Sequence, residues 1–453
     1  MFLEKWIQER IGAGRSIEDY QLHKLRETLD YAQRESPFYR DLFRTNGVDS
    51  GDLRSIEDLA AFPFTTPEHL RADAHRLLCI SLSGVKRTFT LQTGGTTGTP
   101  KKVFFSQGDL DRITDYMGAA MKSVAVSGGI TGNGFKVYTI LPNGKPESQQ
   151  KMLARGVGKV GGMPIAGSLA LTSEEQATHV AKSRPHILFG PTLRVYRITQ
   201  EAKHSRDLGG LGIGILFVTS AYLPPAMRSR LEELWRAQVF AHWGMTEMGW
   251  AGGIECEAHS GFHFNEMDFF LELVDPETGR PSSGHEEGEL VLTTLNREAM
   301  PLIRYRTGDL ATLTTGDCAC GARSLRRIGR VIKKRDSVVE IGEGDRVDPV
   351  MLDDVIYRLP DVTSYQSVLV REQGKERLLL EVELGGGSGN AADIVEAIAG
   401  IPVIRRNLDT GRMVEPEVTV VGRGELRRPG RAKRLIEDAR SGEAAAPRAS
   451  SPG

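Results

Sequence analysis

Residues 93–101 read TGGTTGTPK, and this stretch decides how the rest of the chain is interpreted. Its three glycines let the backbone adopt positive φ and approach a ligand closely. Successive N–H groups in such a turn converge on an anion, the threonine hydroxyls add donors, and Lys101 adds a positive charge. It is not a Walker A loop, because a proline precedes the lysine and a strand-like segment follows it. The stretch predicts a polyphosphate-binding loop, and the simpler alternative is a mobile hairpin loop. The expected phosphate contacts are Thr93, Gly94, Gly95, Thr96, Thr97, Gly98 and Lys101.

The composition of the 453 residues is that of an ordinary globular protein, with 40% hydrophobic and 26% charged residues. Lys and Arg total 58 against 59 Asp and Glu, a formal net charge of -1, which indicates neither a nucleic-acid nor a membrane partner. The start, MFLEKWIQER, lacks the apolar run of a signal peptide, and four cysteines are too few for a disulfide framework. We therefore expect a cytoplasmic protein, either monomer or homodimer, of two or three domains.

Hydrophobic periodicity predicts an α/β fold with a largely buried sheet. The opening segment is helical between Ser16 and Ser36, and a later helix over 173–184 is expected to start with a capping box formed by Ser173 and Gln176. Strands are expected at 85–92, 101–106, 136–141, 186–190, 213–220 and 237–244, and a β-rich subdomain at 262–275 and 288–295. We predict a large N-terminal domain over 1–330, a small α+β domain over 331–440, and a disordered tail over 441–453.

The quoted loop resembles the phosphate loop of the adenylate-forming superfamily, which includes acyl-CoA synthetases, luciferases and nonribosomal adenylation domains. That family's pattern is [ST]-[ST]-G-[ST]-T-G-x-P-K, and Gly94 replaces a hydroxyl residue. Further segments resemble the family's motifs in the family's order. They are TSAYLPP (219–225), HWGMTE (242–247), RYRTGDL (304–310) and RIGR (327–330). Together with the loop, these matches follow one another over more than 230 residues, from 93 to 330, and are far more specific than one.

The resemblance implies a role for each matched residue. Trp243 would lie against the adenine, Thr246 near the α-phosphate, and Glu247 would bind Mg²⁺. Asp309 would accept hydrogen bonds from both ribose hydroxyls, and Arg330 would contact the ribose or a phosphate. The remaining residues expected beside the nucleotide are Ser220, Ala221, His242, Gly244 and Met245.

The chain also resembles one branch of the superfamily, phenylacetate–CoA ligase and its relatives. The short length, LRETLDYAQRESPFYRDLF (25–43) and CACG (318–321) carry this likeness. It implies that a carboxylic acid and ATP give an acyl-adenylate and pyrophosphate, after which CoA takes the acyl group. ATP, Mg²⁺ and CoA are thus the expected cofactors. The small C-terminal domain would be mobile, rotating about a hinge near 330–336 between the half-reactions.

Two alternatives remain open. The acceptor could be an amine, a carrier-protein thiol or a large cofactor, as in the family's coenzyme F390 synthetases. The chain could also be a nucleotide-binding relative without turnover, because the C-terminal G-K-x-x-R pattern reads GRAKR at 430–434. Arg431 occupies the lysine position and Lys433 lies two residues on, so either cation is a candidate for the catalytic role.

Cysteine and histidine pairs predict a zinc site. Thiolates with imidazole favour a closed, tetrahedral structural site, and the phenylacetate–CoA ligase branch sometimes holds zinc here. The candidates are four of the five residues Cys256, His259, His263, Cys318 and Cys320, with the two histidines competing for one place. The alternative is a set of buried thiols beside surface histidines. Cys79 stands among apolar residues and is expected in the core.

The acid is not readable from the sequence. Pocket walls are expected from 138–145, 215–221 and 242–250, whose Tyr138, Phe217, Trp243 and Trp250 would suit an aromatic or medium-sized apolar acid. GVGKVG at 156–161 fits G-x-G-x-x-G. We reject it as a dinucleotide site because Gly162, Met163 and Pro164 follow it where a helix should begin.

Overall fold

A computed structural model describes residues 1–12, 14–91, 100–144, 147–282, 286–329, 332–386, 389–426 and 435–440. The chain forms two compact units. The first comprises Met1–Leu169, Pro185–Leu188 and Phe240–Ile332, and the second comprises Ala170–Arg184, Phe189–Val239 and the residues from Lys333 onward. Within the described ranges, none of the helices combines the length and the apolar character that a bilayer crossing requires.

The first unit holds six of the named α-helices of the described chain. These are α1 (Phe2–Ile11), α2 (Ile17–Glu35), α3 (Pro37–Asn46), α4 (Pro67–Asp73), α5 (Gln107–Ser127) and α6 (Gln149–Lys159). Its strands are β1 (Arg87–Leu91), β2 (Lys101–Phe105), β3 (Lys136–Thr139), β4 (Met163–Ala166), β7 (Gln238–Trp243, from Phe240 on), β8 (Gly253–Glu255), β9 (Phe262–Phe264), β10 (Phe269–Val274), β11 (Gly288–Thr294), β12 (Tyr305–Ala311), β13 (Leu313–Thr314) and β14 (Arg327–Ile328).

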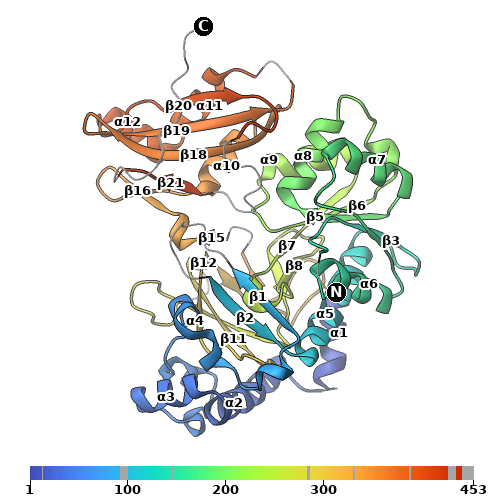
Figure 1. The fold of residues 1–453 in the computed structure, drawn as a ribbon, viewed down its shortest axis with the longest axis vertical. Coiled ribbons are helices and arrows are strands. Elements are labelled where there is room, and N and C mark those ends of the chain that lie inside the picture. Colours follow the sequence, from blue (N-terminus) through green and yellow to red (C-terminus); the bar gives the residue numbers. More distant parts are fainter. Residues whose placement is uncertain are drawn as a thin grey trace. The chain divides into compact units, whose positions relative to one another are not determined.

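Strand pairing in this unit is mostly antiparallel. β1 and β2 form a hairpin, with Leu91 opposite Lys101. β10, β11 and β12 pair in that order. β7, β8, β9, β14 and β13 form a second antiparallel run, and β3 pairs with β4 in parallel. The mixed α/β class predicted from the sequence is confirmed (Figure 1).

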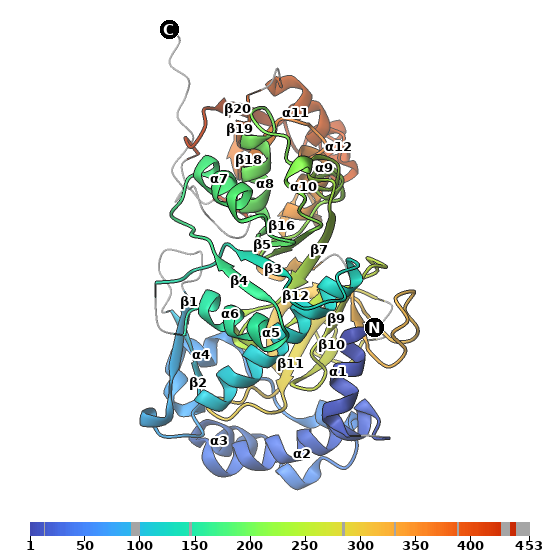
Figure 2. The same cartoon turned by 90° about the vertical axis from the view of Figure 1, so that its right-hand side faces the viewer.

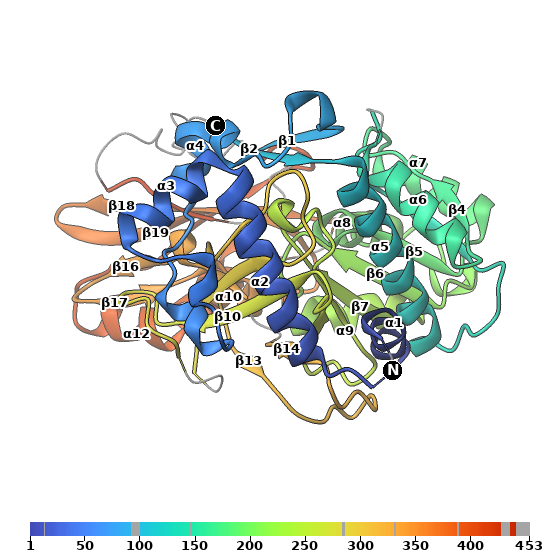
Figure 3. The ribbon, with the colours of Figure 1, turned by 90° about the horizontal axis from the view of Figure 1, so that it is seen from below.

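Helix α2 covers the β10–β11 sheet, as Figure 3 shows. Its apolar residues recur at three- and four-residue spacing, and Leu25, Leu29 and Ala32 are fully buried. The Ser16 side chain caps its first turn by accepting from the Asp19 N–H. The helix stops before Pro37, as expected from the sequence, because proline starts the next helix at its first position.

Helices α5 and α6 lie side by side, with β4 next to α6 (Figure 2). Two glycines permit this approach, since a Cβ on Gly118 would stand 2.4 Å from the Gly156 carbonyl oxygen. Gly156 is the first residue of GVGKVG, and Gly156–Lys159 form the end of α6. Gly156 therefore serves helix packing. This role explains a glycine of the GVGKVG motif without a dinucleotide site.

The second unit combines two parts of the chain. It contains α7 (Ser173–Ser183), α8 (Thr192–Ala202), α9 (Pro225–Trp235), α10 (Pro349–Ile356), α11 (Ala391–Ala399) and α12 (Pro402–Asp409). Its strands are β5 (Ile187–Pro191, from Phe189 on), β6 (Ile215–Thr219), β15 (Lys333–Lys334), β16 (Val339–Ile341), β17 (Asp345–Val347), β18 (Val362–Glu372), β19 (Lys375–Leu384), β20 (Glu417–Val421) and β21 (Ile436–Asp438). The last four form a sheet of order β20-β19-β18-β21.

The start of α7 corrects one sequence expectation. The capping box is formed by Thr172 and Glu175, not by Ser173 and Gln176. The Thr172 hydroxyl accepts from the Glu175 N–H, and the Glu175 carboxylate accepts from the Thr172 N–H. A charged carboxylate reaching back gives a stronger bond than an amide would, so the cap lies one residue earlier. The domain boundaries 1–330, 331–440 and 441–453 stay a prediction, and 441–453 lie outside the described residues.

Candidate active site

Three side chains from distant parts of the sequence meet in the first unit. The Lys101 Nζ donates to Glu247 Oε1 at 2.7 Å, and the Tyr305 hydroxyl donates to the same oxygen at 2.9 Å. Lys101 Nζ also lies 3.2 Å from the Tyr305 hydroxyl oxygen. Lys101 begins β2, Glu247 lies in a short 3₁₀ turn after β7, and Tyr305 begins β12. The structure thus joins the last residue of the quoted loop to the glutamate expected to bind magnesium.

The site is nearly closed to solvent, which strengthens its electrostatics. The Lys101 side chain is 14% exposed and that of Glu247 is 3% exposed. Burial by itself would raise the pKa of Glu247, but the Lys101 charge and the two hydrogen bonds hold that pKa below its ordinary value. Burial, and then the neighbouring Glu247 charge, raise the pKa of the Tyr305 phenol well above normal. The result is a charged pair with a neutral hydroxyl beside it.

The segment 242–247 continues from the buried end of β7. His242 is buried, and its Nε2–H donates to the Trp250 carbonyl oxygen at 2.8 Å. Burial lowers the pKa of His242 to about 4, so the ring is neutral. Trp243 and Met245 are buried, while Gly244 and Thr246 are half-buried. A Cβ on Gly244 would meet the His242 ring at 2.9 Å, which is why glycine occupies this turn.

Asp309 lies in the same strand as Tyr305, beyond a β-bulge. The register between β11 and β12 shifts between Glu289 and Val291, and Gly308 has φ of +68°, which glycine adopts without strain. The Gly308 N–H donates to Glu289 Oε1 at 3.1 Å, and the Asp309 N–H donates to Thr307 Oγ1 at 3.0 Å. The bulge fixes the main chain of the buried Asp309.

Ser220 and Ala221 belong to the second unit and follow β6. Ser220 is exposed and has φ of +76°, an unusual value for a non-glycine residue. The Ala221 carbonyl oxygen accepts from the Thr192 hydroxyl at 3.2 Å.

The residues predicted to line the acid pocket differ in how deeply they are buried. Tyr138 and Phe217 are fully buried, and Trp250 is half-buried, its ring 4.3 Å from that of Phe89. The remaining predicted contacts lie outside the described residues, namely Thr93, Gly94, Gly95, Thr96, Thr97, Gly98, Arg330, Arg431 and Lys433.

The cysteine cluster is assembled in the first unit. Cys256, His263, Cys318 and Cys320 place one donor atom each within 4.8 Å of one another. Of the two histidines left open by the sequence, it is His263 that joins the cluster. His259 has φ of +47° and directs Nδ1 toward Glu255 at 3.5 Å. Cys79 is separate and half-buried, and burial raises its thiol pKa to about 12.

The geometry of this cluster fits a tetrahedral metal. Zinc–sulfur bonds of about 2.3 Å imply sulfur atoms about 3.8 Å apart at the corners of a tetrahedron, and Cys256 Sγ lies 3.7 Å from Cys318 Sγ. Cys320 Sγ lies 3.4 Å from His263 Nε2. Backbone N–H and side-chain hydrogen bonds overcome burial to lower the pKa of Cys318 to about 5. Three thiols and one imidazole are a donor set typical of structural zinc.

Sequence reasoning missed two residues, Tyr305 and Arg297. Tyr305 lies inside the RYRTGDL segment, but the resemblance implies a role there only for Asp309. Arg297 donates to the Glu247 carbonyl oxygen at 3.1 Å. A cation just upstream of the RYRTGDL segment was the only available signal, and one arginine in a chain of this composition is too common to be noticed.

The chain is similar to known proteins over most of its length. The family model described as AMP-binding enzyme matches residues 88–296. The phenylacetate-coenzyme A ligase of Thermus thermophilus is 27% identical over 430 residues, 91% of this chain and 93% of that protein. The enzyme of the same name from Aromatoleum evansii is 28% identical over 448 residues, 96% of each chain. The matches therefore extend over nearly the full length.

Solved structures agree on the fold. A 2-hydroxyisobutyryl-CoA ligase in the postadenylation state in complex with R3-HIB-AMP has a TM-score of 0.77, with 20% identity, over 95% of this chain and 92% of that one. At this level of identity the likeness shows a shared fold. In sequence, the chain is similar over most of its length to enzymes named phenylacetate-coenzyme A ligase.

Proposed function

We propose that this chain is an ATP-dependent, AMP-forming acid–CoA ligase. The observation that carries the proposal is the 2.7 Å pair between Lys101 and Glu247, residues 146 positions apart, at the end of the glycine–threonine loop. The Lys101 ammonium can bind the phosphates of Mg·ATP, and the Glu247 carboxylate can bind its magnesium. Similar relatives that are named phenylacetate-coenzyme A ligase support the same reaction.

The reaction has two steps. In the first, a carboxylate oxygen of the acid attacks the α-phosphorus of ATP, the bond to pyrophosphate breaks, and an acyl-adenylate forms. In the second, the sulfur of CoA attacks the acyl carbonyl, loses its proton, and displaces AMP. Both steps bring anions together, so catalysis depends on positioning and charge neutralisation.

Lys101 and Glu247 exchange partners in the first step. Lys101 would donate to phosphate oxygens in place of Glu247, and the freed Glu247 carboxylate could then hold a divalent cation. Magnesium supplies neutralisation of the polyphosphate charge. Tyr305 keeps its hydrogen bond to Glu247 and holds the carboxylate in one orientation. Trp243, Thr246 and Asp309 would contact the adenine, the α-phosphate and the ribose.

The cation that reaches the bond-forming oxygens comes from the 430–434 segment, through either Arg431 or Lys433. Replacing each by alanine and measuring the two half-reactions separately identifies which one acts. The residue whose loss abolishes pyrophosphate exchange but leaves thioester formation from a supplied acyl-adenylate intact is the adenylation cation.

Cys256, His263, Cys318 and Cys320 would hold a zinc ion. Its role would be structural, because four protein donors would fill a tetrahedral site and leave no position for a substrate. These residues would then tie the β8–β9 hairpin to the loop around Cys318, which precedes β14.

The acid is a small carboxylic acid, with an aromatic or medium-sized apolar side chain as the class favoured by Tyr138, Trp243 and Trp250. ATP–pyrophosphate exchange over a panel of aromatic and aliphatic acids tests the adenylation. Mass analysis of the product with CoA, an amine or no acceptor then tests the second step. Exchange with at least one acid and a CoA thioester are expected. Exchange without a CoA product would assign another acceptor, and no exchange with any acid would reject the enzyme activity.

A further inference from the structure

One buried guanidinium, that of Arg297, contacts both elements that carry the central ion pair. Its Nη2 donates to the main-chain oxygen of Glu247 at 3.1 Å. Its Cζ lies 4.3 Å from the ring centroid of Phe105, the last residue of β2. Lys101 is the first residue of that strand. Arg297 is 8% exposed, so both contacts are shielded from water and are correspondingly strong.

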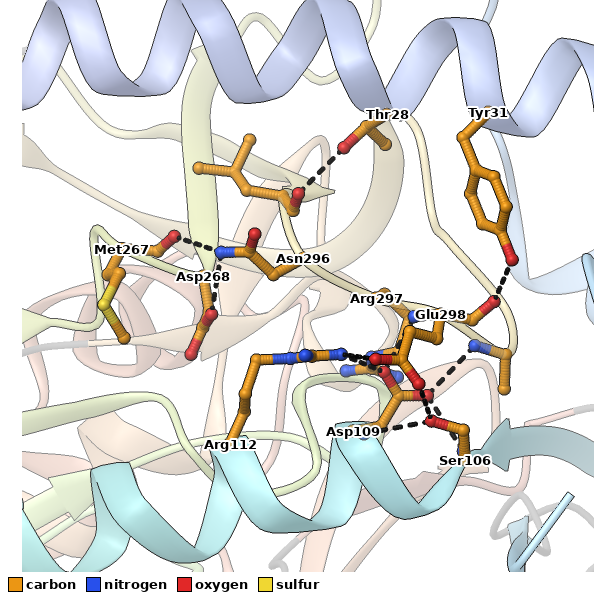
Figure 4. A network of polar contacts seen from close by, with 12 residues as sticks. Thr28, Tyr31, Ser106, Asp109, Arg112, Met267, Asp268, Asn296, Arg297 and Glu298 are labelled. Carbon is orange, nitrogen blue, oxygen red and sulfur yellow. Dashed lines mark hydrogen bonds and ion pairs between the residues drawn. The ribbon is translucent and has the colours of Figure 1, made fainter. Parts of the chain in front are cut away.

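The segment that carries Arg297 is fastened to the start of α5 (Figure 4). The Asp109 carboxylate accepts from the N–H groups of Glu298 at 2.7 Å and Ala299 at 3.0 Å. Ser106 donates to the Glu298 carboxylate at 2.6 Å, and Arg112 donates to the same carboxylate at 3.0 Å. Since α5 follows β2 directly, the two main-chain bonds to Asp109 fix the base of Arg297 to the strand of Lys101.

The Arg297 guanidinium is buried, and its hydrogen bonds within the described residues do not use all of its donors. It borders a cavity of about 20 Å³, which has room for a single water. Its Nη1 is buried and has no hydrogen-bond partner among the described residues. Burial lowers the pKa of Arg297, while Asp109 and Asp268 favour its charged form. A buried cation that leaves one donor unpaired costs stability, which argues for a role beyond packing.

We propose that Arg297 is a positioning residue for adenylation, holding the Glu247 turn in register with the Lys101 strand. The inference rests on the proposed function. The turn that carries Glu247 is only three residues long, Thr246–Met248. A displacement of about 1 Å in such a site can cost two orders of magnitude in rate.

Arg112 provides the matched control. It belongs to the same network, contacts Asp109 and Glu298, and lines the same cavity. The contacts described for it are with side chains of this network and not with the Glu247 turn. A purely structural network predicts the same consequences for both arginines, whereas positioning predicts kinetic consequences for Arg297 alone.

The test compares Arg297→Met, Arg297→Lys and Arg112→Met in the full-length protein. We expect Arg297→Met to lower the exchange kcat by about tenfold or more, the effect of one lost hydrogen bond plus misplacement, and to raise the Mg²⁺ concentration for half-maximal exchange. Arg297→Lys should recover part of both, because an ammonium can still donate to the Glu247 carbonyl. Arg112→Met should lower the melting temperature and leave both kinetic values unchanged.

The binding of Mg·ATP, measured by calorimetry, provides a second readout that needs no turnover. Arg297→Met should weaken Mg·ATP binding, and Arg112→Met should not. If the two variants lower the melting temperature alike and leave kcat, Mg²⁺ dependence and Mg·ATP affinity at the wild-type values, the positioning role is wrong. If the wild type itself gives no exchange, the proposed function fails, and the calorimetric comparison still decides on Arg297.

Discussion

Glu247 is a buried carboxylate whose Oε1 accepts from two donors, Lys101 and Tyr305. A buried charge without such partners would be strongly destabilising. Sequence motifs were sufficient to select Lys101 and Glu247, because both lie in long patterns with little tolerance. They could not select Tyr305, because its role depends on how β12 lies against β2 and the Glu247 turn, which no local pattern encodes.

Replacing Tyr305 by phenylalanine removes one hydrogen bond to Glu247 and no volume. We expect exchange activity to fall about three- to tenfold, as the loss of a hydrogen bond to a charged group implies, with a small change in melting temperature. Exchange kinetics at saturating ATP measure the effect. Tyr365→Phe is the control, since that buried hydroxyl donates to Asp353 at 2.7 Å in the second unit. Equal activity losses in the two variants would contradict the assignment.

His242 gives a pH-dependent prediction for stability. Its pKa is about 4 in the folded protein and about 6.5 when unfolded. As the pH falls from 6.5 to 4, only the unfolded chain takes up the proton, so stability is full above pH 6.5 and is lost below it, by about 3 kcal/mol in total.

Melting temperatures without nucleotide at pH 7, 5.5 and 4.5 check this expectation. The His242→Gln variant should lose less stability over that interval than the wild type, because an amide can donate to the Trp250 carbonyl and does not titrate. His204→Gln, at an exposed position, should retain the wild-type slope. A His242→Gln profile parallel to the wild type would show that the buried ring does not control this loss.

At the scale of elements, periodicity and turn chemistry predicted helices α2 and α7 and strands β1, β2, β3, β5, β6 and β7. The helix over 16–36 appeared as α2 because one face of it is continuously apolar and because Ser16 and Pro37 mark its ends. The start of α7 was misplaced by one residue, since adjacent Thr172 and Ser173 are both good caps and only the carboxylate of Glu175 decides between them. The sequence also left open which histidine joins the cysteines, because the choice depends on the pairing of β9 with β14.

The cysteine cluster holds the β8–β9 hairpin, and its metal can be tested directly. We expect purified protein to contain about one zinc per chain. Cys256→Ser should lose the zinc and lower the melting temperature by several degrees, since breaking a structural metal site removes folding energy. Cys79→Ser should keep the metal. Wild-type protein that carries no zinc and shows no thermal shift when zinc is added would refute the site.

At the scale of the whole molecule, the second unit is discontinuous in sequence. Helix α8 packs within it against the sheet of residues 362–438, and Arg197 forms a two-pronged pair with Glu383 at 2.6 Å in each bond. The sequence could not predict such a unit. Composition and turn patterns mark boundaries between consecutive segments of the chain, and this unit combines segments that are far apart in the sequence. Gln200 reinforces the contact by donating to the Pro360 carbonyl oxygen at 3.0 Å.

The Arg197–Glu383 pair should contribute measurably to stability. Glu383 is 1% exposed, so Glu383→Gln removes the two-pronged partner of Arg197, which keeps Glu201 at 3.5 Å, and should cost about 2 kcal/mol. Replacing Arg197 and Glu383 together by methionine should lower the free energy of unfolding by less than the sum of the two single methionine substitutions. Thermal unfolding of the four proteins measures the coupling. Strictly additive losses would show that the pair does not hold α8 to the sheet.

The most direct measurement of the central claim is Mg·ATP affinity, by calorimetry, for the wild type and the Lys101→Met/Glu247→Gln double variant. The double change removes one positive and one negative charge, so the net charge and the burial of the site stay nearly the same. If Lys101 holds the phosphates and Glu247 their magnesium, the variant should bind Mg·ATP at least about 100-fold more weakly, as the loss of two charge-assisted contacts implies. Equal affinity in a variant that melts at the wild-type temperature would contradict the account.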